Sequence, residues 1–523
     1  MIDIDGDDPG PDATPTRVSG PAATRSQLRG GTLLLAGRTI SLGINFVVQI
    51  LIVRYLTETE YGAFAYALAF VNLAQTIVTF GLDRAITRFV PIYEEHGDYG
   101  RLFGTLILAG GAFVSLGLGA ILVVIGLQDW LTGTVVADEA AMALLVILIF
   151  LAPINALDEL IVGLFAVFAN ARAIFIRRYI FAPLARLLVV GLLVLTEQGV
   201  EFLAVGYVLT GAVILVFYGG VLVRFMRQRG LVERFDRAEV RIPAREVLAF
   251  TVPLLSSDLL YALMSTTDVI LLGHFHSAAD VGALRVILPA ATLNQVIFSS
   301  FALLYTPAAA RLFARDDVPG INDLYWRTAA WMAVLTFPIF LLTFSLAEPF
   351  TVLLFEERYR DSSVYLAILS LGLYFNVALG FNGLTLKVLG RIRYIVTLNL
   401  AAAVVNVALN LLLIPPLGAL GAAIATGTTL IVHNVFKQAG LVLARVHVFD
   451  LRYVLVYGRI AVAAAAVLAI QVLVRPPVVV VVGLAAIATA AVFILNRSVL
   501  DITDTFPEVA RIPVVGWLVR SRP

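Results

Sequence analysis

Apolar segments of about 20 residues alternate with short polar connections along the whole chain, and this alternation constrains the fold more than any other feature. A helix needs about 20 apolar residues to cross a bilayer. We predict fourteen spans, at 31–53, 62–82, 102–127, 141–167, 178–196, 201–223, 246–272, 282–305, 327–346, 362–384, 393–414, 418–440, 453–474 and 477–496. With 60% hydrophobic residues, 14% charged residues and a mean hydropathy of +0.94, the chain is predicted to be an all-α polytopic membrane protein.

The distribution of basic residues supports this count. If the N-terminus is cytoplasmic, connections on the cytoplasmic side hold 29 of the 37 lysines and arginines, and connections on the other side hold five. This is the positive-inside pattern. We therefore expect a multi-pass protein of the cell (cytoplasmic) membrane with both termini in the cytoplasm. The connections are all short, so the sequence leaves no room for a soluble catalytic domain.

Several classes of chemistry are excluded by composition. There are no cysteines, so disulfides, thiol nucleophiles and thiolate metal sites are absent. A net charge of +1 gives no bulk attraction to nucleic acid. His274 and His276, with only Asp268 and Asp280 near them, make a poor metal site, and we expect a solvated turn there. The sequence thus predicts no metal, no cofactor and no nucleic-acid partner.

An internal repeat organises the spans. When the sequence is shifted by 220 residues, Tyr61-Gly62 falls on Val281-Gly282. Two polar sets also superpose: Arg38, Ser41 and Asn45 on Asp258, Tyr261 and Ser265, and Asn72, Gln75 and Thr79 on Thr292, Gln295 and Ser299. Spans 1–6 and 7–12 are therefore predicted to be parallel pseudo-repeats, related by an axis along the membrane normal, with two extra helices after them.

The repeat gives the expected domain boundaries. They are a disordered cytoplasmic N-terminus at 1–30, an N-lobe at 31–223, a cytoplasmic linker at 224–245, a C-lobe at 246–444, the two extra spans at 453–496 and a cytoplasmic tail at 497–523.

One face of the first span is polar, which suggests a cavity. A charge at the centre of a span costs about 2.5–3.5 kcal/mol on insertion scales, so such a face must meet protein or water rather than lipid. We expect the polar faces of spans 1, 2, 7 and 8 to line a central cavity between the lobes. The candidate substrate-binding residues are Arg38, Ser41, Asn45, Gln49, Asn72, Gln75, Arg186, Asp258, Tyr261 and Gln295.

The charged candidates permit two interpretations each. Asp158, Glu159 and Arg186 lie in the inner half of the N-lobe, at a depth similar to the arginine of span 1. They could form a cationic site for a substrate phosphate, with a carboxylate as titrating group or counter-ion, or a buried ion-pair network. Asp258 and Asp268 on span 7 could couple transport to a cation or accept hydrogen bonds from sugars. For Asp268 the alternative is a cap or a hydrogen bond between the lobes. The amides could likewise bind sugar hydroxyls or only join helices.

Three segments resemble the polysaccharide-export flippases, in the superfamily that also holds lipid II flippases and multidrug/toxic-compound extruders. They are Arg54–Phe89, Asp268–Leu284 and Leu386–Thr426. The last has a Gly-Arg turn, an Asn-rich helix that ends in LNLLLIP, and a short turn into GALGAAIAT. The resemblance covers about 30–500 of the chain. It implies two lobes that alternate access to a central site. Lipid II flippases use cavity arginines, including on the first span, which favours a functional role for Arg38.

We therefore expect a transporter and not an enzyme. The favoured hypothesis is a flippase that moves a polyprenyl- or dolichyl-phosphate-linked oligosaccharide from the cytoplasmic to the outer leaflet, for polysaccharide or glycoprotein glycan synthesis. Its partners would be membrane lipids and the lipid-linked glycan. One alternative is a multidrug or small-molecule antiporter coupled to protons or sodium, with Asp258 as the cation site. Another is a membrane glycosyltransferase or glycan polymerase, which the short connections disfavour.

Overall fold

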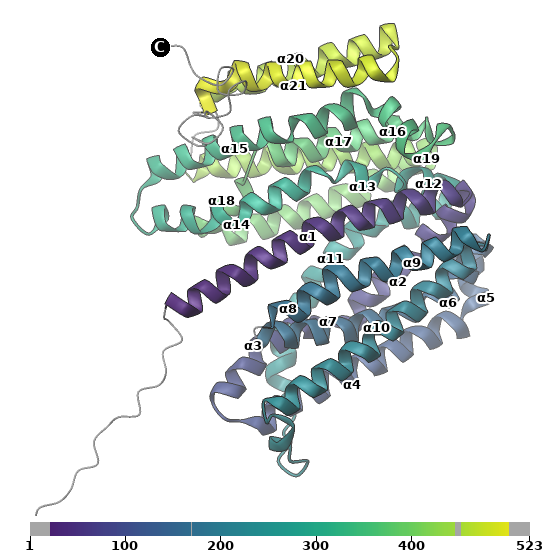
Figure 1. The fold of residues 1–523 in the computed structure, drawn as a ribbon, viewed down its shortest axis with the longest axis vertical. Helices are drawn as coiled ribbons and strands as arrows, with labels where there is room; N and C mark the ends of the chain where they lie inside the picture. Colours follow the sequence, from purple (N-terminus) through teal and green to yellow (C-terminus); the bar gives the residue numbers. More distant parts are fainter. Residues whose placement is uncertain (1–20, 137, 169, 445–450, 501–523) are drawn as a thin grey trace, which may run out of the picture.

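Two helical lobes make up the protein, and the long helix α1 lies along their boundary (Figure 1). The computed structural model describes residues 21–136, 138–168, 170–444 and 451–500. These residues form helices joined by short turns, with no strand among them, which confirms the all-α class. The first 20 residues of the expected disordered N-terminus, and the expected tail beyond residue 500, lie outside the described residues.

The N-lobe contains the first ten α-helices and a π-helix. They are α1 (Pro21–Tyr55), α2 (Glu58–Thr79), α3 (Leu82–Glu95), α4 (Tyr99–Gly126), α5 (Gln128–Thr134), α6 (Glu139–Leu148), α7 (Leu151–Val167), α8 (Ala171–Ile174), η1 (Phe175–Phe181), α9 (Ala182–Leu195) and α10 (Val200–Gln228). Helix α1 begins well before the expected span, because the run after Pro21 contains good helix formers and no strong breaker until Gly30.

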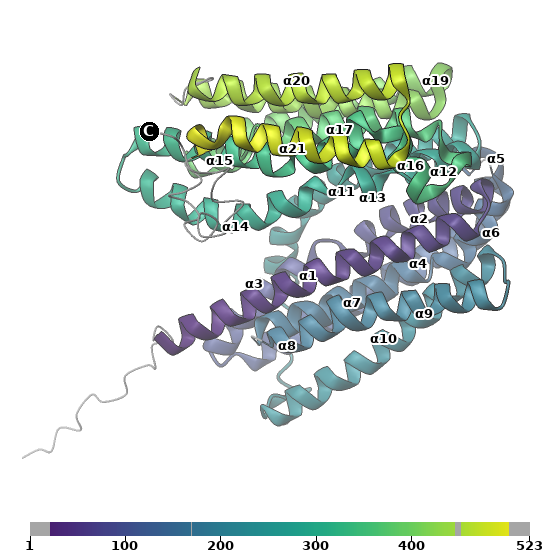
Figure 2. The same ribbon diagram turned by 45° about the horizontal axis from the view of Figure 1, so that its top comes forward.

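The C-lobe and the two added helices follow a short turn, η2 (Val232–Arg234). The elements are α11 (Ala244–Phe275), α12 (Ala278–Arg285), α13 (Leu288–Ala291), α14 (Asn294–Phe313), α15 (Val318–Phe340), η3 (Leu341–Ser345), α16 (Ala347–Phe355), η4 (Glu357–Tyr359), α17 (Ser362–Ala378), α18 (Asn382–Val388), α19 (Ile392–Leu443), α20 (Leu451–Val474) and α21 (Val478–Leu500). Helices α20 and α21 pack on α15 and η3, on the outside of the C-lobe (Figure 2).

Helix α19 is a hairpin of two spans. Its 52 residues would reach about 78 Å if straight, far more than one bilayer. Gly418 breaks it with φ 56° and ψ −134°, a conformation that glycine adopts without strain. The His433 ring contacts the Asn399 side chain at 3.0 Å although 34 residues separate them, so the two halves run antiparallel.

The number of spans stays a prediction. Length and composition identify eleven helices able to cross a membrane among the described residues, or twelve if the bent pair Ala278–Ala291 and Asn294–Ala302 is one span. The hairpin of α19 counts once in that number.

The 220-residue repeat recurs in the local structure. Thr57 and Glu60 form a capping box at the start of α2, and Ser277 and Asp280 form another at the start of α12. A Cβ on Gly62 would lie 1.7 Å from the carbonyl oxygen of Ala278, and one on Gly282 would lie 2.7 Å from that of Glu58. Each glycine thus packs on the backbone of the other repeat, at positions related by the same shift.

Two arginines tie the lobes together beside this contact. Arg358, the middle residue of η4, donates to the carbonyl oxygens of Val53 and Leu56 at the end of α1, at 2.6 and 2.9 Å. In return, Arg54 at the end of α1 donates to the carbonyls of Leu353 and Leu354 at the end of α16. The last carbonyls of a helix have no partner within it, so each arginine satisfies groups that the other lobe leaves open. We call these contacts the arginine clamp.

At the other end of the molecule, the first half of α11 packs on the N-lobe helix α3. Tyr93 donates to Glu246 at 3.0 Å, the rings of Phe89 and Phe250 meet edge to face at 5.6 Å, and Arg88 lies over the Phe250 ring. The second half of α11 packs on α19 and α2. A packing boundary therefore falls within α11, whereas the sequence places the lobe boundary before it.

Candidate functional site

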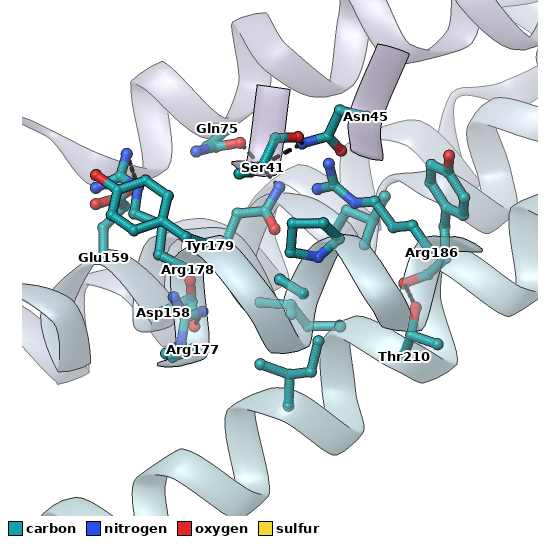
Figure 3. A pocket seen from close by; sticks show the side chains of 18 of the residues that line it. Ser41, Asn45, Gln75, Asp158, Glu159, Arg177, Arg178, Tyr179, Arg186 and Thr210 are labelled. Carbon is teal, nitrogen blue, oxygen red and sulfur yellow. Dashed lines mark hydrogen bonds and ion pairs between the residues drawn. The ribbon is translucent and has the colours of Figure 1, made fainter. Parts of the chain in front are cut away.

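A polar cavity of about 590 Å³ lies inside the N-lobe, lined by α1, α2, α7, η1, α9 and α10 (Figure 3). The sequence instead predicts one cavity between the lobes, lined by spans 1, 2, 7 and 8. The structure differs because the first half of α11 packs on α3 and so does not reach this cavity. We call it the basic pocket, since four arginines and two carboxylates line it: Arg38, Arg177, Arg178, Arg186, Asp158 and Glu159.

The π-helix η1 shapes one wall of the basic pocket. Pro183 lacks an N–H, and just before it the Ala182 N–H donates to Arg177, five residues back. Such widened turns recur at functional sites because they redirect side chains. Gly37 of α1 lets this turn approach, because a Cβ there would lie 2.7 Å from the rings of Phe175 and Tyr179. The glycine thereby places η1 beside Arg38.

Two of the four arginines are paired. Arg177, whose side chain is 6% exposed, forms an ion pair with Asp158, and Arg178 lies 3.9 Å from Glu159. The sequence assigns Arg177 and Arg178 to a cytoplasmic connection, but the structure places both on η1, against α7. Asp158 and Glu159 precede Phe168 by about as many residues as Arg177 and Arg178 follow it. This symmetric spacing about the turn is the sequence feature from which the two ion pairs could have been predicted.

The other two arginines are free. Within the described residues, Arg38 and Arg186 make no hydrogen bond and no ion pair to the protein, and both side chains are exposed. Arg186 lies 5.7 Å from the centre of the Tyr207 ring, a cation–π arrangement. In Figure 3 the guanidinium of Arg186 points into the basic pocket, toward Ser41 and Asn45. Two positive charges are therefore available to a ligand.

Uncharged polar groups complete the lining. Asn45 donates to the carbonyl and hydroxyl oxygens of Ser41, at 2.8 and 3.1 Å. Asn155, which the sequence analysis missed, donates to Gln75 at 3.0 Å. The exposed side chain of Asn72 lines this pocket and also its neighbour. These groups can exchange their hydrogen bonds with a hydroxyl-rich ligand.

A second, smaller pocket adjoins the first. It has about 300 Å³, shares Asn72, Gln75 and Glu159 with the basic pocket, and is also lined by Asp83 and Asp258. We call it the acidic pocket. Asp258 does not meet Arg38; it forms an ion pair of 2.7 Å with Arg84 of α3. Arg84 follows the predicted second span and is expected in a connection. The positive φ values at Phe80 and Gly81, +49° and +67°, instead start the new helix α3 there, and hydropathy does not reveal such backbone angles.

The remaining candidates lie elsewhere. Gln49 donates to the Tyr61 hydroxyl and so joins α1 to α2. Asp268 accepts from the N–H of Val269, the next residue, rather than from the other lobe. Gln295 on α14 lines neither pocket, and the side chain of Tyr261 is outside what the structure describes.

The outer turn that contains His276 is not simply solvated, as the sequence suggests. The Nε2 atom of His276 lies 2.8 Å from the carbonyl oxygen of Ile414 in α19. That carbonyl lies just before the break at Gly418, which leaves it in need of a partner. Among the described residues, no group of three or more histidine or acidic side chains is arranged to hold a metal ion.

Two helical lobes around charged pockets make up the fold, and solved structures of a flippase and of multidrug extruders share this fold. The lipid II flippase MurJ in an inward closed conformation superposes with a TM-score of 0.69 at 13% identity, over 90% of this chain and 100% of MurJ. An inward-facing multidrug resistance MATE family transporter of the MOP superfamily gives 0.60 at 14% identity, over 78% of this chain and 94% of that one.

The chain belongs to the polysaccharide biosynthesis protein family, whose model matches residues 27–313. The MatE family model matches residues 253–412. A curated relative, the uncharacterized membrane protein MJ1068 of Methanocaldococcus jannaschii, is 23% identical over 421 residues, which are 76% of this chain and 80% of the relative. These matches confirm the family resemblance that the sequence motifs indicate.

Proposed function

We propose that this transporter moves a lipid-linked oligosaccharide from the cytoplasmic to the outer leaflet, and that Arg38 and Arg186 bind its phosphate. The observation that carries the proposal is that both arginines line the basic pocket and that neither forms a hydrogen bond or an ion pair with the described residues. A charge held in a span without a partner is costly, so it is retained where a ligand neutralises it. Guanidinium groups match phosphate oxygens in geometry and charge.

The rest of the basic pocket suits the sugar part of such a substrate. Its volume of about 590 Å³ is within the usual range for ligand pockets, so it would hold the phosphate and the first sugars rather than a long glycan. The side chains of Asn45, Asn72 and Asn155 offer donors and acceptors for hydroxyl groups. The lipid tail would remain in the bilayer.

The arginine clamp supports alternating access. It holds the lobes together at one end, next to the glycine contact, while both pockets lie toward the other end of α1 and α2. The lobes can separate at the clamp end only if the hydrogen bonds of Arg54 and Arg358 break. A substrate can drive the change only if it binds the two arrangements with different affinity, and the free arginines are groups that could differ in this way.

The acidic pocket favours a second candidate, a cation-coupled antiporter of drugs or other small molecules. Asp83, Glu159 and Asp258 line a small space between N-lobe helices and α11 of the C-lobe, where a proton or sodium ion could compete with Arg84 for Asp258. Under this alternative the basic pocket would hold an organic anion. Cation coupling is also compatible with the flippase proposal.

A leaflet assay tests the proposal. The purified protein is reconstituted into liposomes with a fluorescent polyprenyl-phosphate-linked oligosaccharide, and the fraction that reaches the opposite leaflet is measured with a membrane-impermeant quencher. Hydrogen bonds to charged groups contribute about 1.5–3 kcal/mol, so Arg38→Gln or Arg186→Gln should each slow transfer at least about tenfold.

Arg391→Gln is the matched control, since Arg391 is exposed and lines neither pocket. Its transfer rate should equal that of the wild type. Unimpaired transfer in Arg38→Gln and Arg186→Gln would remove both residues from the site. Efflux of a cationic dye against a proton or sodium gradient, without movement of the glycolipid, would replace the flippase by the antiporter.

A further inference from the structure

A third pocket, of about 510 Å³, lies where α16 meets the turn between α20 and α21. Its polar lining comes from Glu348, Arg360, Gln471 and Arg475, and its apolar lining includes Val352 and Leu353. None of the residues of the basic or acidic pocket takes part. The two added helices, which the proposed transport mechanism does not use, supply half of its polar groups.

Two of these polar groups have no partner within the described residues. The exposed guanidinium of Arg475 makes no hydrogen bond or ion pair, and its backbone takes the left-handed φ of +48° directly after the end of α20. The Oε1 atom of Gln471, one helical turn earlier, is buried without a donor. A buried acceptor without a donor is energetically unfavourable, so a ligand that supplies a donor there gains affinity.

Arg360, by contrast, is engaged. It donates to Glu348 at 2.7 Å and to Glu357 at 2.6 Å, and its hydrogen bond lowers the pKa of the Glu357 carboxyl group. The carboxylate of Glu348 therefore lies beside the positive charge of Arg360. The pocket presents a free cation, Arg475, and two acceptors, Glu348 and Gln471.

The pocket lies beside the ends of two apolar helices, which is where lipid headgroups are expected. The spans Tyr453–Val474 and Val479–Leu500 end on either side of Arg475, so this residue follows directly after the apolar part of α20. Just below it, Leu473 is 82% exposed and Leu353 is 58% exposed, as expected of side chains that face lipid tails. A headgroup here would thus have its tails against α16 and α20.

From these observations we infer that the pocket between α16 and the α20–α21 turn binds a phospholipid whose headgroup joins a phosphate to a hydrogen-bond donor, such as an ammonium or hydroxyl group. The phosphate binds Arg475, and the donor binds Gln471 Oε1 and Glu348. A quaternary ammonium has no N–H, so a choline headgroup leaves the Gln471 acceptor unsatisfied.

This site is connected to the arginine clamp. The carbonyl of Leu353, in the wall of the pocket, accepts a hydrogen bond from Arg54, and Arg360 lies two residues after Arg358. A lipid that orders α16 and η4 also orders the acceptors and donor of the clamp. A lipid bound in this pocket therefore favours the arrangement in which the arginine clamp is closed. The role of α20 and α21 would be to bind that lipid.

Native mass spectrometry of the full-length protein tests the inference. The protein, held in detergent, is titrated separately with dioleoyl phosphatidylethanolamine, dioleoyl phosphatidylcholine and inorganic phosphate. These two lipids have the same net charge and differ in the N–H donor. We expect the ethanolamine lipid to bind about tenfold more tightly than the choline lipid, because one hydrogen bond is gained.

Two variants and one control locate the site. Arg475→Gln should weaken binding of both lipids about tenfold, since each loses its phosphate contact. Gln471→Leu should remove only the preference for ethanolamine, so it tests the site independently of the arginine. Arg391→Gln, an exposed arginine at a different helix end, should bind as the wild type does.

Three results would overturn the inference. One is equal affinity of the wild type and Arg475→Gln for the ethanolamine lipid. Another is equal affinity of the wild type for the two lipids. The last is binding of inorganic phosphate as tight as that of lipid, which would make the pocket a site for a free anion.

Discussion

Arg84 on α3 and Asp258 on α11 form an ion pair of 2.7 Å between helices that are far apart in the sequence and belong to different repeats. Their side chains are 49% and 26% exposed, because the pair borders the acidic pocket. Three further contacts follow along the same two helices toward Tyr93 and Glu246. The contact between α3 and the first half of α11 therefore runs from Tyr93 and Glu246 to this ion pair, which lies at the acidic pocket.

Asp258→Asn should loosen this contact without unfolding the protein. Exposed ion pairs contribute about 0–1 kcal/mol, so the apparent melting temperature should change little. The loss should be local: hydrogen exchange of the α11 amides near Asp258 should become faster, while exchange in α4 stays the same.

A double-mutant cycle provides the control for this pair. In Arg84→Gln/Asp258→Asn, exchange should be no faster than in either single variant, because the shared interaction is already lost. Additive effects of the two substitutions would show that the residues act separately, and unchanged exchange in Asp258→Asn would mean that the pair holds nothing in place.

Arg358→Gln should destabilise the protein by about 1.5–3 kcal/mol, because it removes charged hydrogen bonds to the last carbonyls of α1. A thermal unfolding series in one detergent measures this. Arg358→Lys should recover only part of the loss, since an ammonium cannot reach several carbonyls with the fixed geometry of a guanidinium. A melting temperature for Arg358→Gln equal to that of Arg391→Gln would contradict the clamp.

Asp158→Asn should be strongly destabilising, by about 3–5 kcal/mol, because it leaves the buried charge of Arg177 without compensation. The neighbouring pair supplies a matched comparison. Arg178 and Glu159 are 50% and 41% exposed and 3.9 Å apart, so Glu159→Gln should change stability by less than about 1 kcal/mol. Urea or thermal unfolding of the two variants, which differ by one position, distinguishes a buried pair from an exposed one.

The Asp158 prediction has its own internal check. Arg177→Met together with Asp158→Asn should be more stable than Asp158→Asn alone, since the uncompensated charge is gone. If the double variant were less stable, Arg177 would stabilise the fold by its packing, for example over the Tyr218 ring, and not through its charge.

Gly62→Ala should destabilise the protein by at least about 1–3 kcal/mol, because the added Cβ would lie 1.7 Å from the Ala278 carbonyl oxygen and backbone cannot move aside as a side chain can. Gly110 in α4 has nothing within 4 Å of its Cβ position, so Gly110→Ala should stabilise the helix by about 0.5–1 kcal/mol. Thermal unfolding should therefore move in opposite directions for the two substitutions, and a shift in the same direction would contradict the close contact.

Much of the architecture could be predicted from the sequence, because hydropathy and repeats report burial in lipid directly. The 220-residue shift aligns the capping boxes that begin at Thr57 and Ser277 and the glycines that follow them. Gly418 separates two spans although the helix continues through Pro415-Pro416, since the reversal depends on backbone angles at a single glycine. The sequence motif indicates the turn there but not its form.

The partners of the charged side chains could not be predicted as well from the sequence. Arg38 and Asp258 superpose in the repeat, yet the partner of Asp258 is Arg84, because α11 crosses to α3. The N-lobe location of the basic pocket follows from the packing of η1 on Gly37, which no periodicity reveals. Arg38, Ser41, Asn45, Asn72, Gln75 and Arg186 line one pocket, as expected of polar side chains that lipid would not accommodate, and their role in substrate binding stays a prediction.

The contact between Gly62 and Gly282 has a further consequence. Each glycine meets the residue four positions before its counterpart, so the contact is isologous, the pattern found where two identical subunits meet about a twofold axis. The two halves of this single chain therefore meet in the same way as two identical subunits of a homodimer. Because this interface is made of backbone atoms, it does not depend on the side chains around it, and matched positions in the two halves can carry opposite charges, as Arg38 and Asp258 do.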